Sequence, residues 1–183
     1  LYNLSAQTTF RIGGGAGYKE PTIFTEESES RQFRNILSLD YDLIRPERSS
    51  GVNADLNHVF EFSNGDSINL NVLLFYTTVK DPLHLEVQGL NQFSFSQAYD
   101  YLDTRGSEIN MAWRRDNFKL FLGYTHTDVK QHDLKGSHDY PLVPRDRLNT
   151  ILVYEREDDI RIGLEAYYYG EQALKNKTGT RAC

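Results

Sequence analysis

The sequence is poor in cysteine and in long apolar segments. Its one cysteine, Cys183, excludes an internal disulfide and a cysteine metal cluster. No segment approaches the ~18 consecutive apolar residues of a membrane-spanning helix, and the mean hydropathy is −0.58. These absences exclude a helical membrane protein. They are compatible with a membrane β-barrel, whose strands alternate in polarity and therefore average to hydrophilic values.

Basic residues are outnumbered by acidic ones, 20 to 26, and tryptophan is scarce, whereas other aromatics are abundant. The formal net charge is −6, so we expect no nucleic-acid partner, because binding to nucleic acid relies on clustered cations. Tryptophan and methionine each occur once, against 12 tyrosines and 10 phenylalanines. Tyrosine and phenylalanine favour β-structure, and they also form the aromatic girdles of membrane barrels.

The segment 56–76 has the clearest local pattern, LNHVFEFSNGDSINLNVLLFY. Apolar and polar residues alternate on both sides of a polar turn, which is typical of two strands that each have one apolar face. Asn64-Gly65 supplies residues that tolerate positive φ in the turn. The segment therefore predicts a β-hairpin.

The same alternation predicts about seven strands in the chain. We expect them over residues 1–12, 48–62, 68–79, 104–113, 118–125, 148–154 and 160–168. The connections between them alternate between long and short. Bacterial outer-membrane barrels have this asymmetry, with short periplasmic turns and long extracellular loops. We therefore predict an all-β, antiparallel, up-and-down transmembrane β-barrel in the outer membrane.

Aromatic residues near the strand ends support this interpretation. Tyr76, Tyr124 and Tyr168 lie near the predicted outer ends, and Trp113 and Phe118 lie near the short turns. Two aromatic bands at opposite ends are typical of residues at the two membrane interfaces. The alternative is a soluble β-sandwich that buries these aromatics in its core or uses them to bind carbohydrate.

Two segments resemble the barrel of TonB-dependent outer-membrane receptors. The first is a Phe-Arg strand followed by a Gly-Tyr-Lys-x-Pro-Thr segment, and the second is a Pro-Glu segment that opens the next strand. The matching residues are Phe10, Arg11, Gly17, Tyr18, Lys19, Pro21, Thr22, Pro46 and Glu47. The stretch 21–27, PTIFTEE, is similar to cobalamin- or iron-siderophore-type receptors of Bacteroidetes.

The resemblance implies an active-transport function. Such receptors bind a scarce ligand such as an iron-siderophore or cobalamin, and the TonB complex supplies the energy for import. They also carry a plug domain and have roughly 22 strands. Nothing in residues 1–183 matches a plug or closing strands, so we expect an incomplete portion of a large barrel. A passive porin-type channel remains the alternative for a membrane protein.

Ligand selectivity in such receptors lies in the extracellular loops and the plug. Phe33, Arg34, Tyr99 and Tyr101 are the loop residues that we predict to contact ligand. The outer-membrane lipid, the plug and the TonB complex are the other expected partners. We expect no cofactor and no enzymatic activity.

Three other patterns have simpler explanations than a catalytic or metal site. His126, His132 and His138 alternate with aspartates, but the spacing matches no known metal motif, so we predict no metal site. The acidic residues around Glu27 are expected to be a solvated loop surface. The run GGGAG at 13–17 lacks the Lys-Ser/Thr of a phosphate-binding loop, and we expect it to mark a strand end.

Overall fold

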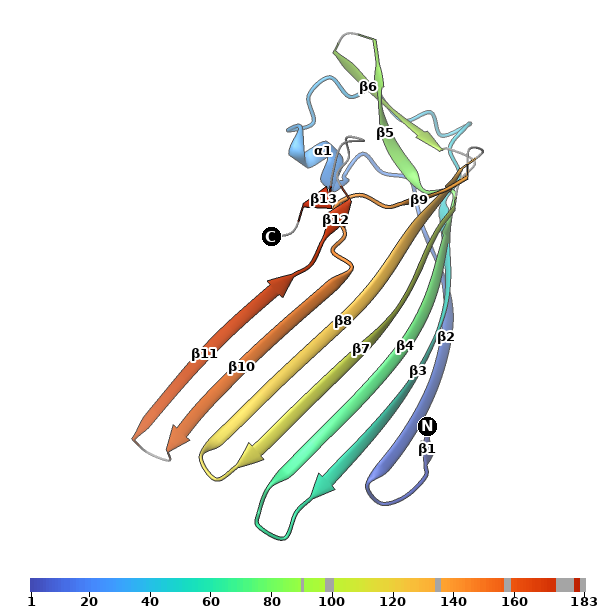
Figure 1. Cartoon of the computed structure of the whole chain (residues 1–183). Coiled ribbons are helices and arrows are strands. Elements are labelled where there is room, and N and C mark those ends of the chain that lie inside the picture. The colour runs from blue at the N-terminus through green and yellow to red at the C-terminus, as the bar shows by residue number, and fades with distance from the viewer. Residues whose placement is uncertain (90, 98–100, 134–135, 157–158, 174–179, 182–183) are drawn as a thin grey trace.

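The computed structural model describes residues 1–183 except 90, 98–100, 134–135, 157–158, 174–179 and 182–183. Strands dominate, and the described helix α1 has a single turn (Figure 1). The elements are β1 Tyr2–Asn3, β2 Thr8–Lys19, α1 Glu26–Ser30, β3 Glu47–Glu61, β4 Ser67–Lys80, β5 Leu83–Gln88, β6 Gln92–Gln97, β7 Tyr101–Arg115, β8 Phe118–Asp133, β9 Gly136–Asp139, β10 Asp146–Arg156, β11 Ile160–Tyr169, β12 Gln172–Ala173 and β13 Thr180–Arg181. Among the described residues, no helix is long and apolar enough to cross a membrane.

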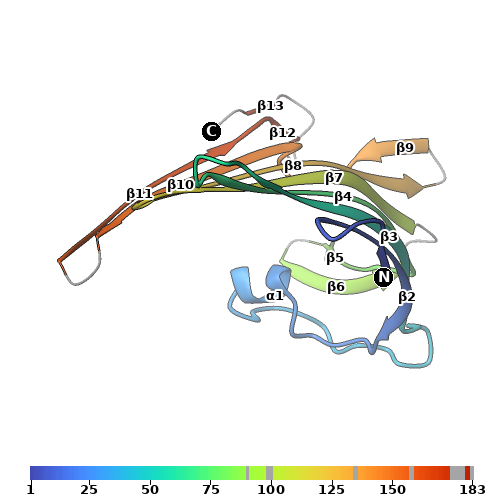
Figure 2. The ribbon, with the colours of Figure 1, turned by 90° about the horizontal axis from the view of Figure 1, so that it is seen from below.

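The main sheet is an antiparallel meander. Its strand order is β1-β2-β3-β4-β7-β8-β10-β11, and β9 adds to the end of β8. Each long strand pairs with the next long strand in the chain, which is the up-and-down order that the sequence predicts. The sheet curves into an open arc that does not close on itself (Figure 2).

The predicted asymmetry of the connections is confirmed. Tight turns lie at one end of the arc, whereas α1, β5, β6 and β9 lie at the other (Figure 1). The turn between β3 and β4 closes through the Phe62 amide, which donates to the Asp66 carbonyl, and Gly65 has φ 88°. That positive φ explains why glycine follows asparagine in this turn.

The start of the first predicted strand was wrong. Tyr2 faces Phe10 and Asn3 faces Thr9, so the chain reverses between β1 and β2 instead of continuing straight. The physical reason is local hydrogen bonding: Ser5 Oγ accepts from the Gln7 amide at 3.2 Å and donates to Thr8 Oγ1 at 3.0 Å. Short hydroxyl side chains compete with strand pairing in this way.

The expected end of that strand was also wrong. The glycine run continues the strand, and β2 pairs with β3 as far as Lys19 facing Glu47. A Cβ at Gly13 would lie 2.8 Å from Asn53 Oδ1, so glycine leaves room for the facing asparagine. The strands on the long-loop side also extend beyond prediction, since β7 begins at Tyr101 and β8 reaches Asp133.

Candidate functional site

The two faces of the curved sheet differ in polarity. The strand registers place one set of alternate residues on the convex face, and this set is apolar and exposed: Ile12, Val52, Leu56, Leu74, Ile109, Phe118, Tyr124, Leu148, Leu152, Ile162 and Leu164. Only Leu39 is a buried hydrophobic residue among those described. A soluble sandwich would cover this face, whereas lipid covers it in a membrane barrel.

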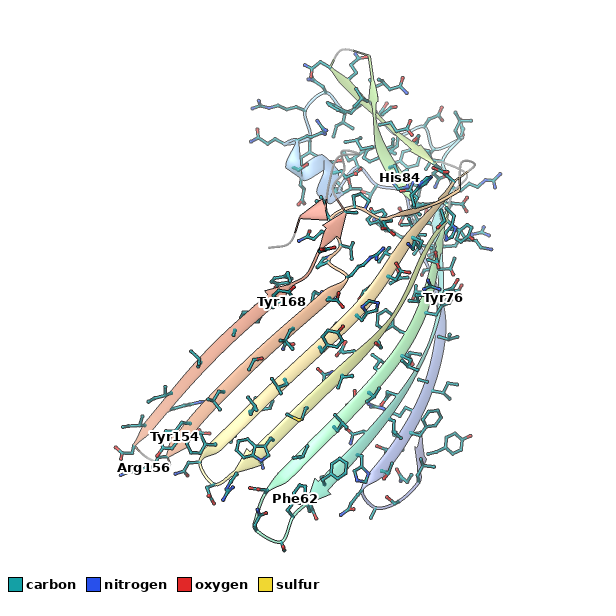
Figure 3. The ribbon with its side chains drawn as sticks, in the orientation of Figure 1. Phe62, Tyr76, His84, Tyr154, Arg156 and Tyr168 are labelled. Carbon is teal, nitrogen blue, oxygen red and sulfur yellow. The ribbon has the colours of Figure 1, made fainter. Side chains whose placement is uncertain are left out.

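Aromatic side chains lie at both ends of this convex belt. Phe118 packs on Tyr154 near the short turns, with ring centroids 5.0 Å apart. Tyr76 and Tyr168 lie toward the long-loop end (Figure 3). The predicted aromatic bands are therefore present on the outward face, where tyrosine and tryptophan meet lipid headgroups.

The concave face carries a row of asparagines that sequence reasoning did not single out. Asn57, Asn71 and Asn110 face one another across β3, β4 and β7, and Asn149 lies in the same row beyond Gly123. A Cβ at Gly123 would lie 2.2 Å from Asn149 Oδ1. Glycine therefore leaves space for the neighbouring amide, and the row lines a groove of about 430 Å³. A neutral amide can both donate and accept hydrogen bonds, so this row does not require a charged partner.

An ion pair lies next to the asparagine row on the same face. Arg11 Nε donates to both carboxylate oxygens of Asp55 at 2.9 Å, and Asn71 Nδ2 donates to Asp55 Oδ1 at 3.2 Å. Lys19 faces Glu47 farther along β2 and β3, with 3.9 Å between Nζ and Oε2. The motif residues Arg11, Lys19 and Glu47 therefore stabilise strand pairing by facing opposite charges.

The long loops form a folded unit above the concave face. Figure 2 shows α1 and the β5–β6 hairpin on that side of the sheet. Two backbone hydrogen bonds join the first loop to β6: the Leu37 amide donates to the Phe93 carbonyl at 2.8 Å, and the Phe93 amide donates to the Asn35 carbonyl at 2.9 Å. We call residues 20–46 with β5 and β6 the vestibule unit.

Two glutamates anchor β5 within this unit. Glu27 Oε2 accepts from the Leu85 amide and Glu47 Oε1 accepts from the Leu83 amide, both at 2.9 Å. The expectation that Glu27 belongs to a merely solvated surface was therefore wrong. Charged acceptors bind amide donors more strongly than neutral acceptors do. Thr25 begins α1 by accepting a hydrogen bond from the Ser28 amide at 3.3 Å.

The structure brings two of the four predicted ligand contacts together. Phe33 and Arg34 are neighbours in an exposed turn of the vestibule unit, where Phe33 has φ 56°. The Phe33 ring meets Phe24 edge-to-face at 5.7 Å. Arg31 lies two residues before Phe33, and its sequence position is compatible with contact to an anionic ligand, although an ordinary loop surface is the simpler expectation. In the structure its guanidinium lies 3.9 Å from the Phe93 ring centroid.

The other two predicted contacts lie elsewhere. Tyr101 begins β7 on the convex side and stacks on His132 with ring centroids 4.3 Å apart. Tyr99 lies outside the described residues.

The remaining motif residues lie on or beside β2 and β3. Phe10 and Tyr18 are on the convex face and Gly17 is on the concave face. Pro21 and Thr22 follow β2, and Pro46 precedes β3.

The histidines of β8 and β9 do not converge. His126 Nδ1 lies 2.8 Å from Asp146 Oδ1, His132 pairs with Asp103, and His138 Nε2 lies 3.6 Å from Asp133 Oδ1. Within the part of the chain that the structure describes, no three metal-ligating side chains come together.

The pairing of β9 with β8 is expected to depend on pH. A hydrogen bond from Lys130 and the charge of Arg145 hold the pKa of Asp139 below its ordinary value. A carboxyl pKa that is lower in the folded state stabilises that state at pH values above the pKa of the unfolded chain. This contribution disappears as the pH falls through the pKa of the folded state. We expect faster amide exchange in residues 136–139 below about pH 4, after correction for intrinsic rates. Asp139→Asn should lose this pH dependence, and an unchanged profile would contradict the assignment.

An exposed apolar convex face, a polar concave face and two aromatic bands define this chain as a portion of an outer-membrane β-barrel. The family described as TonB dependent receptor-like, beta-barrel matches residues 1–182. The chain belongs to this family, whose members lie in the outer membrane of Gram-negative bacteria.

A solved structure supports the same fold. The FrpB iron transporter from Neisseria meningitidis (F3-3 variant) superposes with a TM-score of 0.65 and 15% sequence identity. The match covers 93% of this chain and 26% of that protein, so the chain spans about a quarter of the transporter's length. No curated protein sequence matches the chain.

Proposed function

We propose that the chain forms one side of the barrel of an active transporter that binds a scarce ligand outside the cell and imports it with energy from the TonB complex. The observation that carries this proposal is the vestibule unit above a polar concave wall, in a chain of the TonB-dependent receptor family. A plug domain in the full-length protein would occupy the space beside that wall. Further strands would continue the sheet from β11 and from β2.

An iron-siderophore is the ligand class that we favour, and a cobalamin-like ligand is the second. Support comes from the vestibule unit, where Phe24 and Phe33 present exposed rings beside Arg31 and Arg34. Aromatic faces and guanidinium groups suit a flat anionic chelate, because arginine binds carboxylates and similar anions through paired donors. The likeness to an iron transporter agrees with this ligand class.

The test is growth and uptake by a strain that lacks the gene and is complemented with the full-length protein. We expect ferric siderophore to restore growth under iron limitation, and radioactive iron uptake to require TonB and the proton gradient. Phe33→Ala with Arg34→Ala should lower uptake about tenfold, since two contacts of ~0.7 kcal/mol each give this factor. Tyr41→Ala, at another exposed position of the same loop, is the matched control.

Three outcomes would redirect the proposal. Uptake that survives loss of TonB and of the proton gradient would indicate a passive channel. Growth that responds to cobalamin and not to ferric siderophores would change the ligand class. Equal losses of uptake in the Phe33–Arg34 variant and the Tyr41 variant would show that Phe33 and Arg34 do not bind the ligand.

A further inference from the structure

Cations on this sheet commonly face an acid on the neighbouring strand. The facing pairs are Arg11 with Asp55, Lys19 with Glu47, Arg105 with Asp128, Lys130 with both Asp103 and Asp139, and Arg161 with Glu155. The shortest N–O distance is 2.8 Å in the Arg11–Asp55 pair and 2.9 Å in the Arg105–Asp128 pair. Opposite charges at facing positions stabilise strand pairing, whereas like charges destabilise it.

Arg48 and Lys80 break this pattern. They face each other across β3 and β4, and both side chains are exposed. Among the described residues, neither has a carboxylate within 4.0 Å. Arg114 and Lys119 also face each other, but Lys119 Nζ lies 2.6 Å from Glu155 Oε2. The Arg48–Lys80 pair therefore lacks the nearby carboxylate that the Arg114–Lys119 pair has in Glu155.

The position of this pair places it beside lipid headgroups. Arg48 and Lys80 share the convex face with Val52 and Tyr76, and they lie farther toward the long-loop end. A rise of ~3.3 Å per residue and a tilt of ~40° put Lys80 about 10 Å beyond Tyr76 along the membrane normal. Headgroups begin at the level of the aromatic band.

Tyrosines flank the two cations on the neighbouring strands. Tyr18 faces Arg48 from β2, and Tyr101 faces Lys80 from β7. Tyr18, Arg48 and Pro46 line an open groove of about 560 Å³, and Glu20 is the one acidic residue in its lining. Arg48 is the cation of this lining, and Lys80 faces it from β4.

We propose that Arg48 and Lys80 bind the phosphate of an anionic lipid in the outer leaflet, with Tyr18 and Tyr101 packing beside the headgroup. The phosphate would supply the negative charge that the facing cations lack. Arginine can bind phosphate through two parallel donors, and lysine adds a point charge. The proposal requires the outer-membrane location and is independent of which ligand the protein transports.

The test measures lipid retention by the full-length protein in detergent, using native mass spectrometry with phosphatidic acid and, separately, phosphatidylcholine. Lys80→Glu replaces the facing cation by an acid. We expect it to weaken phosphatidic acid binding about 25-fold, roughly fivefold for each unit of charge. The same variant should melt at a higher temperature in lipid-free detergent, because Arg48 gains an acidic partner.

Arg161→Glu is the matched control, since it makes the same charge change on the concave face, where Arg161 faces Glu155. We expect this variant to retain phosphatidic acid like the wild type. Equal losses in the two variants would overturn the proposal, as would equal retention of phosphatidylcholine and phosphatidic acid. Excess inorganic phosphate and excess soluble phosphatidic acid can be compared as competitors. If inorganic phosphate displaced the bound lipid as effectively as phosphatidic acid does, the site would be a free-phosphate site and the lipid assignment would be wrong.

Discussion

Replacing Leu122 by arginine is expected to weaken membrane insertion of the full-length protein by ~2 to 4 kcal/mol, the cost of a cation near mid-bilayer on a barrel's lipid face. Leu122 lies in β8 on the convex face, between Met111 and Thr150 of the neighbouring strands. Leu122 lies between the aromatic residues Phe118 and Tyr124 of the same strand, so a charged side chain there would be placed within the apolar belt. Equilibrium refolding into lipid vesicles across a denaturant series would measure the loss.

Thr125→Arg is the control for this prediction. Thr125 lies three residues farther along β8 but on the concave face, where it faces Glu108 of β7 and Arg147 of β10. An arginine there would meet water, an acid on one side and a cation on the other, so the two facing charges offset each other and we expect a change within about 0.5 kcal/mol. Similar losses in both variants would contradict the assignment of the two faces.

Replacing Gly106 by valine should destabilise the sheet by roughly 1 to 3 kcal/mol, the usual cost of overpacking. A Cβ at Gly106 would lie 2.3 Å from the His126 carbonyl oxygen and 2.5 Å from Phe75 Cζ. Phe75 faces Gly106 across β4 and β7, so its ring occupies the space that the glycine leaves. The carbonyl belongs to the backbone of β8, and the strands must therefore move apart to relieve the contact.

Gly15→Ala provides the comparison for Gly106. Gly15 lies in β2, and a Cβ there would have no neighbour within 4 Å. We expect the alanine variant to unfold at the same denaturant concentration as the wild type, or slightly higher, because alanine has less backbone entropy to lose. If Gly106→Val refolded into vesicles as well as Gly15→Ala, the close packing of Phe75 over Gly106 would not matter for stability.

Local patterns were sufficient to predict the long strands and their order. The hairpin of β3 and β4 follows from two alternating segments around Asn64-Gly65, and the structure pairs these strands from Arg48 facing Lys80 to Glu61 facing Ser67. Polarity alternation also predicted which residues share the convex face. The strand ends were harder to predict, because strand pairing beyond the membrane continues over polar residues such as those of 126–133.

The vestibule unit could not be predicted in the same way. Its hydrogen bonds join residues far apart in the chain, such as Glu27 with Leu85 and Arg45 with Gln97. The hairpin of β5 and β6 lies within a segment that the sequence indicated only as a long loop. Phe33 and Arg34 were predicted as ligand contacts, but their proximity to Phe24 and Arg31 depends on how the loop folds around α1.

The amino-acid sequence by itself determined the strand order, the end at which the long loops lie and the polarity of the two faces, because period-two alternation and turn residues act over a few neighbours. Tertiary structure decided what happens between strands: the asparagine row, the glycines that make room for Phe75 and Asn149, and the facing pair Arg48 and Lys80. These features depend on register, and register is fixed only when the strands pair across the whole sheet.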